Sequence, residues 1–324
     1  MLRVILFLAG IALLVILLWH LGPSEIVASL ERIGWYSIPV LALYAANQFV
    51  RALALRVCVL RPGLLAYRDA LATRLSGEAI QSLTLTGPLL AEPTRAWLLT
   101  RRGLTLQEGF AAAITEYLIN SFVTAAMSIA GLVYVVRRFE PASAIAGLAI
   151  SIIVLFSAFL VAAAIAIIRR FYLLGTVIAW LARIGVLRGR LRPDMPWINR
   201  MEDLLLAVLR DRPGRFVSIA LLDTAAQGLL VLELLCLFRA LDVASTALTA
   251  CLVEASTKII DIAFLFVPLQ VGVAEGTYAL VFTVMGLPSA AGFAVAFVRR
   301  IRSLVVATVG LVTLALLTRE VRNH

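Results

Sequence analysis

The sequence predicts an all-α, polytopic helical membrane protein, built as an inverted internal repeat with two broken or re-entrant helical hairpins. Composition, a series of long apolar runs and a repeated motif lead to this prediction. The 324 residues are 62% hydrophobic and 15% charged, with a mean hydropathy of +1.00. A soluble domain is typically about 45–50% apolar and about 25% charged. Composition therefore excludes a soluble enzyme, a disordered chain and a secreted disulfide scaffold, and we expect a single transmembrane domain over residues 1–324.

Six apolar runs are long enough to cross a bilayer, which requires about 20 residues at a helical rise of about 1.5 Å. The first run follows Arg3, and a signal peptide is the competing interpretation. No small-residue cleavage site is evident and many spans follow, so we favour a retained anchor. The six runs cover residues 4–21, 36–59, 108–136, 142–168, 215–240 and 290–318.

Two further stretches, residues 70–100 and 245–287, are apolar but are interrupted by Gly, Pro and charged residues. We expect each to form a pair of half-helices or a re-entrant hairpin. The predicted breaks fall at Gly87-Pro88 and between Pro268 and Gly272.

The basic residues predict the orientation. Residues 169–215 carry ten arginines against four acids, and such segments stay in the cytoplasm. We therefore expect residues 169–214 to be a cytoplasmic basic amphipathic linker, with an interfacial helix at 171–187. Both termini are expected in the cytoplasm of a bacterial-type cytoplasmic (inner) membrane. Arg137 and Arg138 fall on the outer side, against the rule. The net charge of +10 is explained by anionic lipid headgroups, so no nucleic acid partner is expected.

An internal repeat relates the two halves. Residues 91–116 align with 274–299 at an offset of 183, with identities at 11 of 26 positions that include Glu, Phe and two Gly. Upstream the offset becomes 180. We expect a first repeat at 36–136 and a second at 215–318. The second predicted span runs inward and the fifth outward, so the repeats would be inverted. This plan recurs in transporters.

Charged and amide side chains recur within the predicted membrane segments. A charge at the bilayer centre costs on the order of 2.5–3.5 kcal/mol, so these residues must pair, face the interior or line a hydrated path. Structural pairing is the alternative for any one of them. Asp223, Glu233 and Arg302 also lie inside predicted spans. The candidate transport residues are Arg95, Glu92, Glu275, Glu116, Arg299, Arg300, Arg74, Glu78, Glu254, Lys258, Asp261, Asn47, Arg51 and Gln227.

Some of these positions have specific expectations. Glu116 and Arg299 are equivalent in the repeat, so we expect a Glu116–Arg299 or Glu116–Arg300 pair near the middle of the protein. Glu92 and Glu275 each lie near the start of a half-helix, where a carboxylate either caps the helix or takes part in gating or proton coupling. Arg95 is expected to contact a lipid phosphate, because guanidinium binds phosphate through two parallel hydrogen bonds.

The trio Arg74, Glu78 and Gln81 aligns with Glu254, Lys258 and Asp261. Each trio has i, i+4, i+7 spacing, which is one face of a helix, and the charge signs are largely exchanged between the halves. Coincidence between two charged helix faces is the alternative.

The motif GPLLAEPTRAWLL at 87–99, followed by RRG at 101–103 and by Thr115-Glu116-Tyr117, resembles the transmembrane region of the lysylphosphatidylglycerol synthase family and its stand-alone flippase-like relatives. Val271-Gly272-Val273-Ala274-Glu275 and Arg300 resemble the second motif of that family. The resemblance covers nearly the whole chain. Ala91, Tyr117 and Asn120 depart from the usual Gly, Arg and Asp.

The resemblance implies movement of a polar lipid between leaflets. The aminoacyl-transfer domain of the full synthase is not expected in these residues, so lipid aminoacylation is not implied. We expect a flippase that moves a polar, anionic lipid through a charged midplane cleft, with a membrane phospholipid as partner. No catalytic residue, cofactor or metal is expected. The alternatives are a membrane-embedded lipid-modifying enzyme and a non-transporting subunit of a lipid-synthesis complex.

Overall fold

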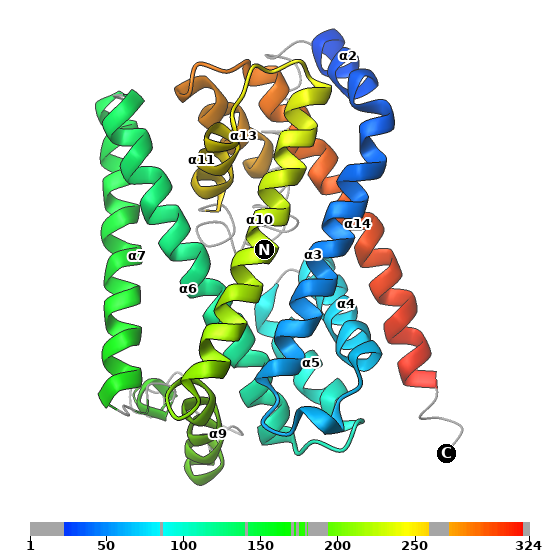
Figure 1. Ribbon diagram of the computed structural model, residues 1–324, viewed down its shortest axis with the longest axis vertical. Helices are drawn as coiled ribbons and strands as arrows, with labels where there is room; N and C mark the ends of the chain where they lie inside the picture. Colours follow the sequence, from blue (N-terminus) through cyan, green and yellow to red (C-terminus); the bar gives the residue numbers. More distant parts are fainter. Residues whose placement is uncertain are drawn as a thin grey trace.

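The computed structural model describes residues 23–84, 87–139, 142–169, 172, 175–178, 180, 194–258 and 272–319 (Figure 1). These residues form α-helices joined by short turns, and no strand occurs among them. The predicted span at 4–21, nearly all of the predicted interfacial helix at 171–187, the Pro268 end of the second break and Asp261 lie outside the described residues.

Five helices in the described part are long and apolar enough to cross a membrane. They confirm five of the predicted runs to within a few residues. The first is preceded by a short helix, α2 (Pro23–Ile33), and by the turn Gly34–Tyr36, which extend that apolar segment back to Val27. The five helices are α3 (Ser37–Cys58), α6 (Leu106–Phe139), α7 (Ser143–Arg169), α10 (Pro213–Ala240) and α14 (Ser289–Arg319).

Four shorter helices form two pairs. α4 (Tyr67–Leu83) precedes α5 (Pro88–Thr100), and α11 (Ala247–Thr257) precedes α13 (Val273–Val284). Gly87, with φ of 47°, stands directly before α5, and Gly272, with φ of 76°, stands directly before α13. Glycine suits both positions because a Cβ disfavours positive φ. The break predicted at Gly87-Pro88 is confirmed, with Pro88 as the first residue of α5, a position where its missing N–H is harmless.

The two halves pack against each other along their length. α3 lies along α10, α4 against α14, and α6 against α11. In Figure 1, α4 and α5 lie in the lower half of the molecule, and α11 and α13 lie in the upper half. α3 descends while α10 rises, and α6 rises while α14 descends (Figure 1). Opposite directions of this kind are what an inverted repeat requires.

Two equivalent glycines allow equally close helix crossings in the two halves. A Cβ on Gly109 of α6 would lie 2.6 Å from the carbonyl oxygen of Ala96 in α5. A Cβ on Gly292 of α14 would lie 2.7 Å from the carbonyl oxygen of Tyr278 in α13. Small residues at such crossings let backbones approach in membranes. The inverted repeat remains a prediction, and these matching contacts support it.

Most of the surface of α7 is apolar and exposed. Leu148, Val154, Leu155 and Val161 are each more than half exposed, and α7 packs chiefly against α6. A helix that exposes such side chains is suited to contact with lipid.

The linker contains a helix that the sequence analysis did not place. α9 (Met195–Leu209) is amphipathic and buries one apolar face against α6. The Trp197 ring meets the Phe110 ring edge-on, with centroids 5.8 Å apart. Arg215 at the start of α10 donates to the carbonyl oxygens of Val59 and Leu60, at 3.0 and 3.3 Å. α9 therefore packs against α6, and the start of α10 is bonded to the residues that end and follow α3.

Candidate functional site

A first network of six charged side chains is buried among α3, α4, α5 and α6. Glu116 of α6 is at its centre and is 1% exposed. Arg51 donates through Nε and Nη2 to Glu116 Oε1, at 3.0 and 2.7 Å. Arg74 Nη1 lies 3.6 Å from Glu116 Oε1, and Arg95 Nη1 lies 4.0 Å from Glu116 Oε2. One carboxylate therefore attracts three guanidinium groups from three helices.

The other two carboxylates of this network pair along their own helices. Arg74 Nη2 donates to Glu78 Oε2 at 3.0 Å, and Arg74 Nε donates to the side-chain oxygen of Gln48 at 3.1 Å. Arg95 Nη1 donates to Glu92 Oε1 one turn earlier on α5. Three arginines and three glutamates make the network neutral as a set. We call these six residues the first-half network: Arg51, Arg74, Glu78, Glu92, Arg95 and Glu116.

A second network lies among α10, α11, α13 and α14, and an arginine is at its centre. Arg299 Nη1 donates to Glu254 Oε2 at 2.6 Å, and Arg299 Nε donates to Glu233 Oε1 at 3.2 Å. The same guanidinium donates to the Tyr278 hydroxyl and to the Leu230 carbonyl oxygen, at 2.5 and 3.0 Å.

Two more cations complete this second set. Lys258 Nζ lies 2.7 Å from Glu254 Oε1, and Arg302 pairs with Glu233. We call these five residues the second-half network: Glu233, Glu254, Lys258, Arg299 and Arg302.

The two networks use equivalent positions with opposite charge. The central Glu116 and the central Arg299 are related by the offset of 183. Arg74, which pairs with Glu78 at i+4, is related by the offset of 180 to Glu254, which pairs with Lys258 at i+4. The exchange of signs predicted from the sequence therefore corresponds to ion pairs within each half.

The predicted Glu116–Arg299 or Glu116–Arg300 pair is wrong. Glu116 pairs with arginines of its own half, Arg299 with Glu233 and Glu254, and Arg300 Nη2 with Glu275 Oε1 at 2.9 Å. Equivalent residues meet only if both lie on the symmetry axis. Here each central residue has opposite charges closer to it in its own half.

Tyr44 connects the two networks. Its hydroxyl donates to Glu78 Oε1 at 2.9 Å, and the Arg302 guanidinium lies 3.7 Å from its ring centroid. Cations bind aromatic faces at such distances. A continuous chain of polar contacts therefore runs through the interior from Arg95 to Lys258. Charges that reached the surface independently would not form such a chain.

The remaining candidates have mainly structural contacts. Glu275 accepts a hydrogen bond from the Gly272 N–H at 2.9 Å, which is the capping alternative of the two roles expected for it, whereas Glu92 lies beyond the first turn of α5 and does not cap it. Asn47 Nδ2 donates to the Ala226 carbonyl oxygen at 2.8 Å. Gln227 Nε2 lies 3.2 Å from the Thr124 hydroxyl and 3.4 Å from the Asn120 side-chain oxygen. The two amides therefore join α10 to α3 and α6.

Sequence reasoning missed the part played by two tyrosines. Tyr44 and Tyr278 are buried and each contacts an arginine of the second-half network. Tyr44, Gln48 and Arg51 recur at i, i+4 and i+7, so their common helix face could have been read from the sequence.

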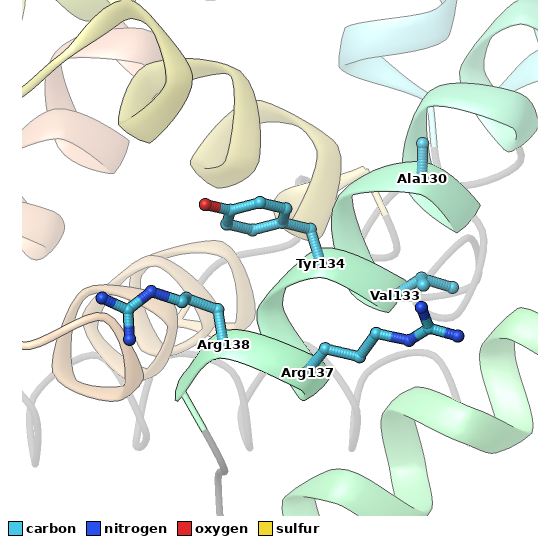
Figure 2. A pocket seen from close by; sticks show the side chains of 5 residues that line it. All are labelled: Ala130, Val133, Tyr134, Arg137 and Arg138. Atoms are coloured by element: carbon cyan, nitrogen blue, oxygen red, sulfur yellow. The ribbon is translucent and has the colours of Figure 1, made fainter.

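A hollow of about 390 Å³ lies at the other end of α6. Arg137, Arg138 and Tyr134 are among the residues that line it, and Figure 2 shows the two arginine side chains pointing away from each other at the end of the helix. Arg137 is 21 residues beyond Glu116, or about 32 Å along the helix. The hollow is therefore separate from the first-half network. The two arginines beside it are explained by their position, because cations near a helix C-terminus interact favourably with the helix dipole.

The helices and the buried charges define a class: a polytopic, helical integral membrane protein whose interior holds ion-paired side chains from both halves of the chain. The family model described as the lysylphosphatidylglycerol synthase TM region matches residues 2–310. The chain therefore belongs to this family. Comparison with curated proteins and comparison with solved structures each gave no match. Among the described residues no group of His, Cys, Asp and Glu is arranged to hold a metal ion.

Proposed function

We propose that this protein moves a polar lipid with an anionic headgroup between the leaflets of a bacterial-type cytoplasmic membrane, without changing the lipid chemically. The observation that best supports this proposal is that Arg95 is buried with two of its guanidinium nitrogens unpaired among the residues that the structure describes. Its side chain is 1% exposed, yet Nε and Nη2 have no hydrogen-bond partner among the described residues. A buried donor left without a partner costs about 1–3 kcal/mol. In this proposal the headgroup of the lipid supplies the missing acceptors.

The chemistry of these donors favours a phosphate. Nε and Nη2 form one edge of the guanidinium plane, and this edge can bind two oxygens of a phosphate at once. Arg74 Nη1 is another buried nitrogen without a hydrogen bond in the described part of the chain. An anionic headgroup at this place would meet two guanidinium groups and would compete with Glu92 and Glu116 for them.

The two faces of α5 fit the two ends of a lipid. Arg95 lies on the buried face, whereas Leu89, Leu90 and Trp97 are exposed. Acyl chains would therefore remain against an apolar surface while the headgroup enters between α4, α5 and α6. Gly77 of α4 makes room for the Arg95 side chain, because a Cβ there would overlap it.

The inverted repeat supplies a route to both leaflets in this proposal. The first-half and second-half networks are joined through Tyr44, so opening of one half can be linked to closure of the other. We place both termini in the cytoplasm, which puts the α4–α5 pair on the cytoplasmic side. The charged midplane cleft of the sequence analysis would form when the paired side chains exchange a partner for the headgroup.

Proteoliposomes test this proposal. Purified protein should accelerate movement of headgroup-labelled phosphatidylglycerol from the outer to the inner leaflet, measured by protection from a membrane-impermeant quencher. Arg95→Ala and Glu92→Gln should lose most of this activity. Arg101→Ala is the matched control, because Arg101 ends the same helix but is exposed. Equal rates in wild type and Arg95→Ala would contradict the site, and equal rates with and without protein would contradict the function.

A further inference from the structure

Asp223 is a buried acid that neither network uses. It lies in α10, ten residues from the start of that helix, and is 0% exposed. Neither carboxylate oxygen has a hydrogen-bond partner among the described residues. The other buried carboxylates described above each accept at least one hydrogen bond from a cation, a hydroxyl or a backbone N–H. Asp223 therefore differs from them in that no donor among the described residues bonds to it.

The charges around Asp223 explain this difference. Four ionisable groups interact electrostatically with Asp223: Arg51 and Cys58 of α3, Glu116 of α6 and Arg74 of α4. The first-half network already balances its three arginines with three glutamates. An ionised Asp223 would add a fourth negative charge with no donor facing it. Isolated buried carboxylates avoid this large penalty by keeping their proton.

We propose that Asp223 is a proton-binding site, and that release of its proton transfers Arg51 from Glu116 to Asp223. In the arrangement described here the carboxyl group holds the proton and Arg51 pairs with Glu116. When the proton leaves to water, the new carboxylate attracts the same guanidinium. The ion pair between α3 and α6 is then replaced by an ion pair between α3 and α10.

Arg51 is suited to this exchange. Both of its hydrogen bonds go to a single oxygen of Glu116, and Arg74 and Arg95 remain within 4.0 Å to stabilise that carboxylate. The Arg51 side chain is 16% exposed, against 2% for Arg74 and 1% for Arg95. Arg51 is therefore the least buried arginine of the first-half network and the one with the most room to move to a new partner.

For transport, the exchange means that a proton gradient would shift Arg51 between two partners, Glu116 and Asp223. This consequence rests on the proposed function, whereas protonation of Asp223 does not. Lipid movement would then be driven by the proton gradient across the membrane.

Infrared spectroscopy of the full chain in lipid nanodiscs tests the proton site directly. Wild type at neutral pH should show the carbonyl stretch of a protonated carboxylic acid, which disappears as the pH is raised. Asp223→Asn should remove this band. Asp242→Asn is the control, because Asp242 is exposed at the end of α10, and it should keep the band. An unchanged band in Asp223→Asn overturns the proposal. If that variant does not fold, the same band is measured in Asp223→Glu. A shift in its frequency would support the proposal, and an unchanged frequency would overturn it.

A second arm separates the proton site from the function. In proteoliposomes, the rate of headgroup translocation with a pH gradient is divided by the rate without one. This ratio should differ from one in wild type and in Asp242→Asn, and should equal one in Asp223→Asn. A ratio unaffected by Asp223→Asn overturns the coupling. If wild type moves no lipid but the infrared band behaves as expected, the proposed function fails and the proton site stands.

Discussion

Replacing Glu116 by glutamine should destabilise the protein strongly. Arg51 donates two hydrogen bonds to Glu116, at 3.0 and 2.7 Å, and nitrogens of Arg74 and Arg95 lie at 3.6 and 4.0 Å from it. Glutamine keeps an acceptor oxygen but removes the charge that holds three buried guanidinium groups together.

Two estimates give the size of this effect. Hydrogen bonds to charged groups contribute about 1.5–3 kcal/mol each, so two of them amount to about 3–6 kcal/mol. Removing one partner of a buried ion pair costs about 3–5 kcal/mol. Because the amide still accepts a hydrogen bond, we expect the lower part of this range, about 3 kcal/mol, as the loss in the free energy of unfolding of Glu116→Gln.

The control lies on the same helix. Glu108 pairs with Arg61 at 2.7 Å, but the Arg61 side chain is 61% exposed. Exposed pairs contribute about 0–1 kcal/mol, and glutamine can still cap the helix start as Glu108 does. Reversible unfolding in mixed detergent micelles should therefore separate Glu116→Gln from Glu108→Gln by about 2 kcal/mol or more. Equal stabilities would refute the buried network as a source of stability.

Two further predictions concern the repeat. Gly109→Ala and Gly292→Ala should each lower the unfolding midpoint, because each new Cβ meets a backbone carbonyl of the neighbouring helix. Gly228→Ala should raise it slightly, since nothing lies within 4 Å of the new Cβ and alanine favours helix by about 1 kcal/mol. A midpoint lowered equally in all three would contradict the close crossings. In a chain without its native cysteines, Thr105→Cys should be labelled from the cytoplasmic side and Pro288→Cys from the other. Labelling of both from one side would rule out the inversion.

The long helices could be predicted from the sequence because length and hydropathy alone define them. The break before α5 was equally accessible, since Gly87 permits a positive φ and Pro88 suits a helix start. α9 was missed because it lies in the arginine-rich segment 169–215, whose charge was interpreted as that of a linker, although α9 itself contains a single arginine, Arg200. Asp194, whose side chain accepts from the Trp197 N–H at 3.2 Å, is the N-cap that could have located it.

The buried charges were predicted individually but their pairing was not. Sequence spacing reveals neighbours on one helix, such as Arg74 and Glu78, and this pair is present. It does not reveal which helices lie close, so the partner of Glu116 was assigned by symmetry and the assignment was wrong. Asp223 was recognised as a charge within a span, but its lack of a partner is a property of packing that no spacing shows.

The most direct test of headgroup binding by the first-half network is photo-cross-linking with phosphatidylglycerol that carries a diazirine on its headgroup. In membranes holding wild type, labelled peptides should come from α4 and α5, around Gly77 and Arg95, and Arg95→Ala should abolish this labelling. Labelling confined to the exposed apolar surface of α7, or unchanged in Arg95→Ala, would contradict the account.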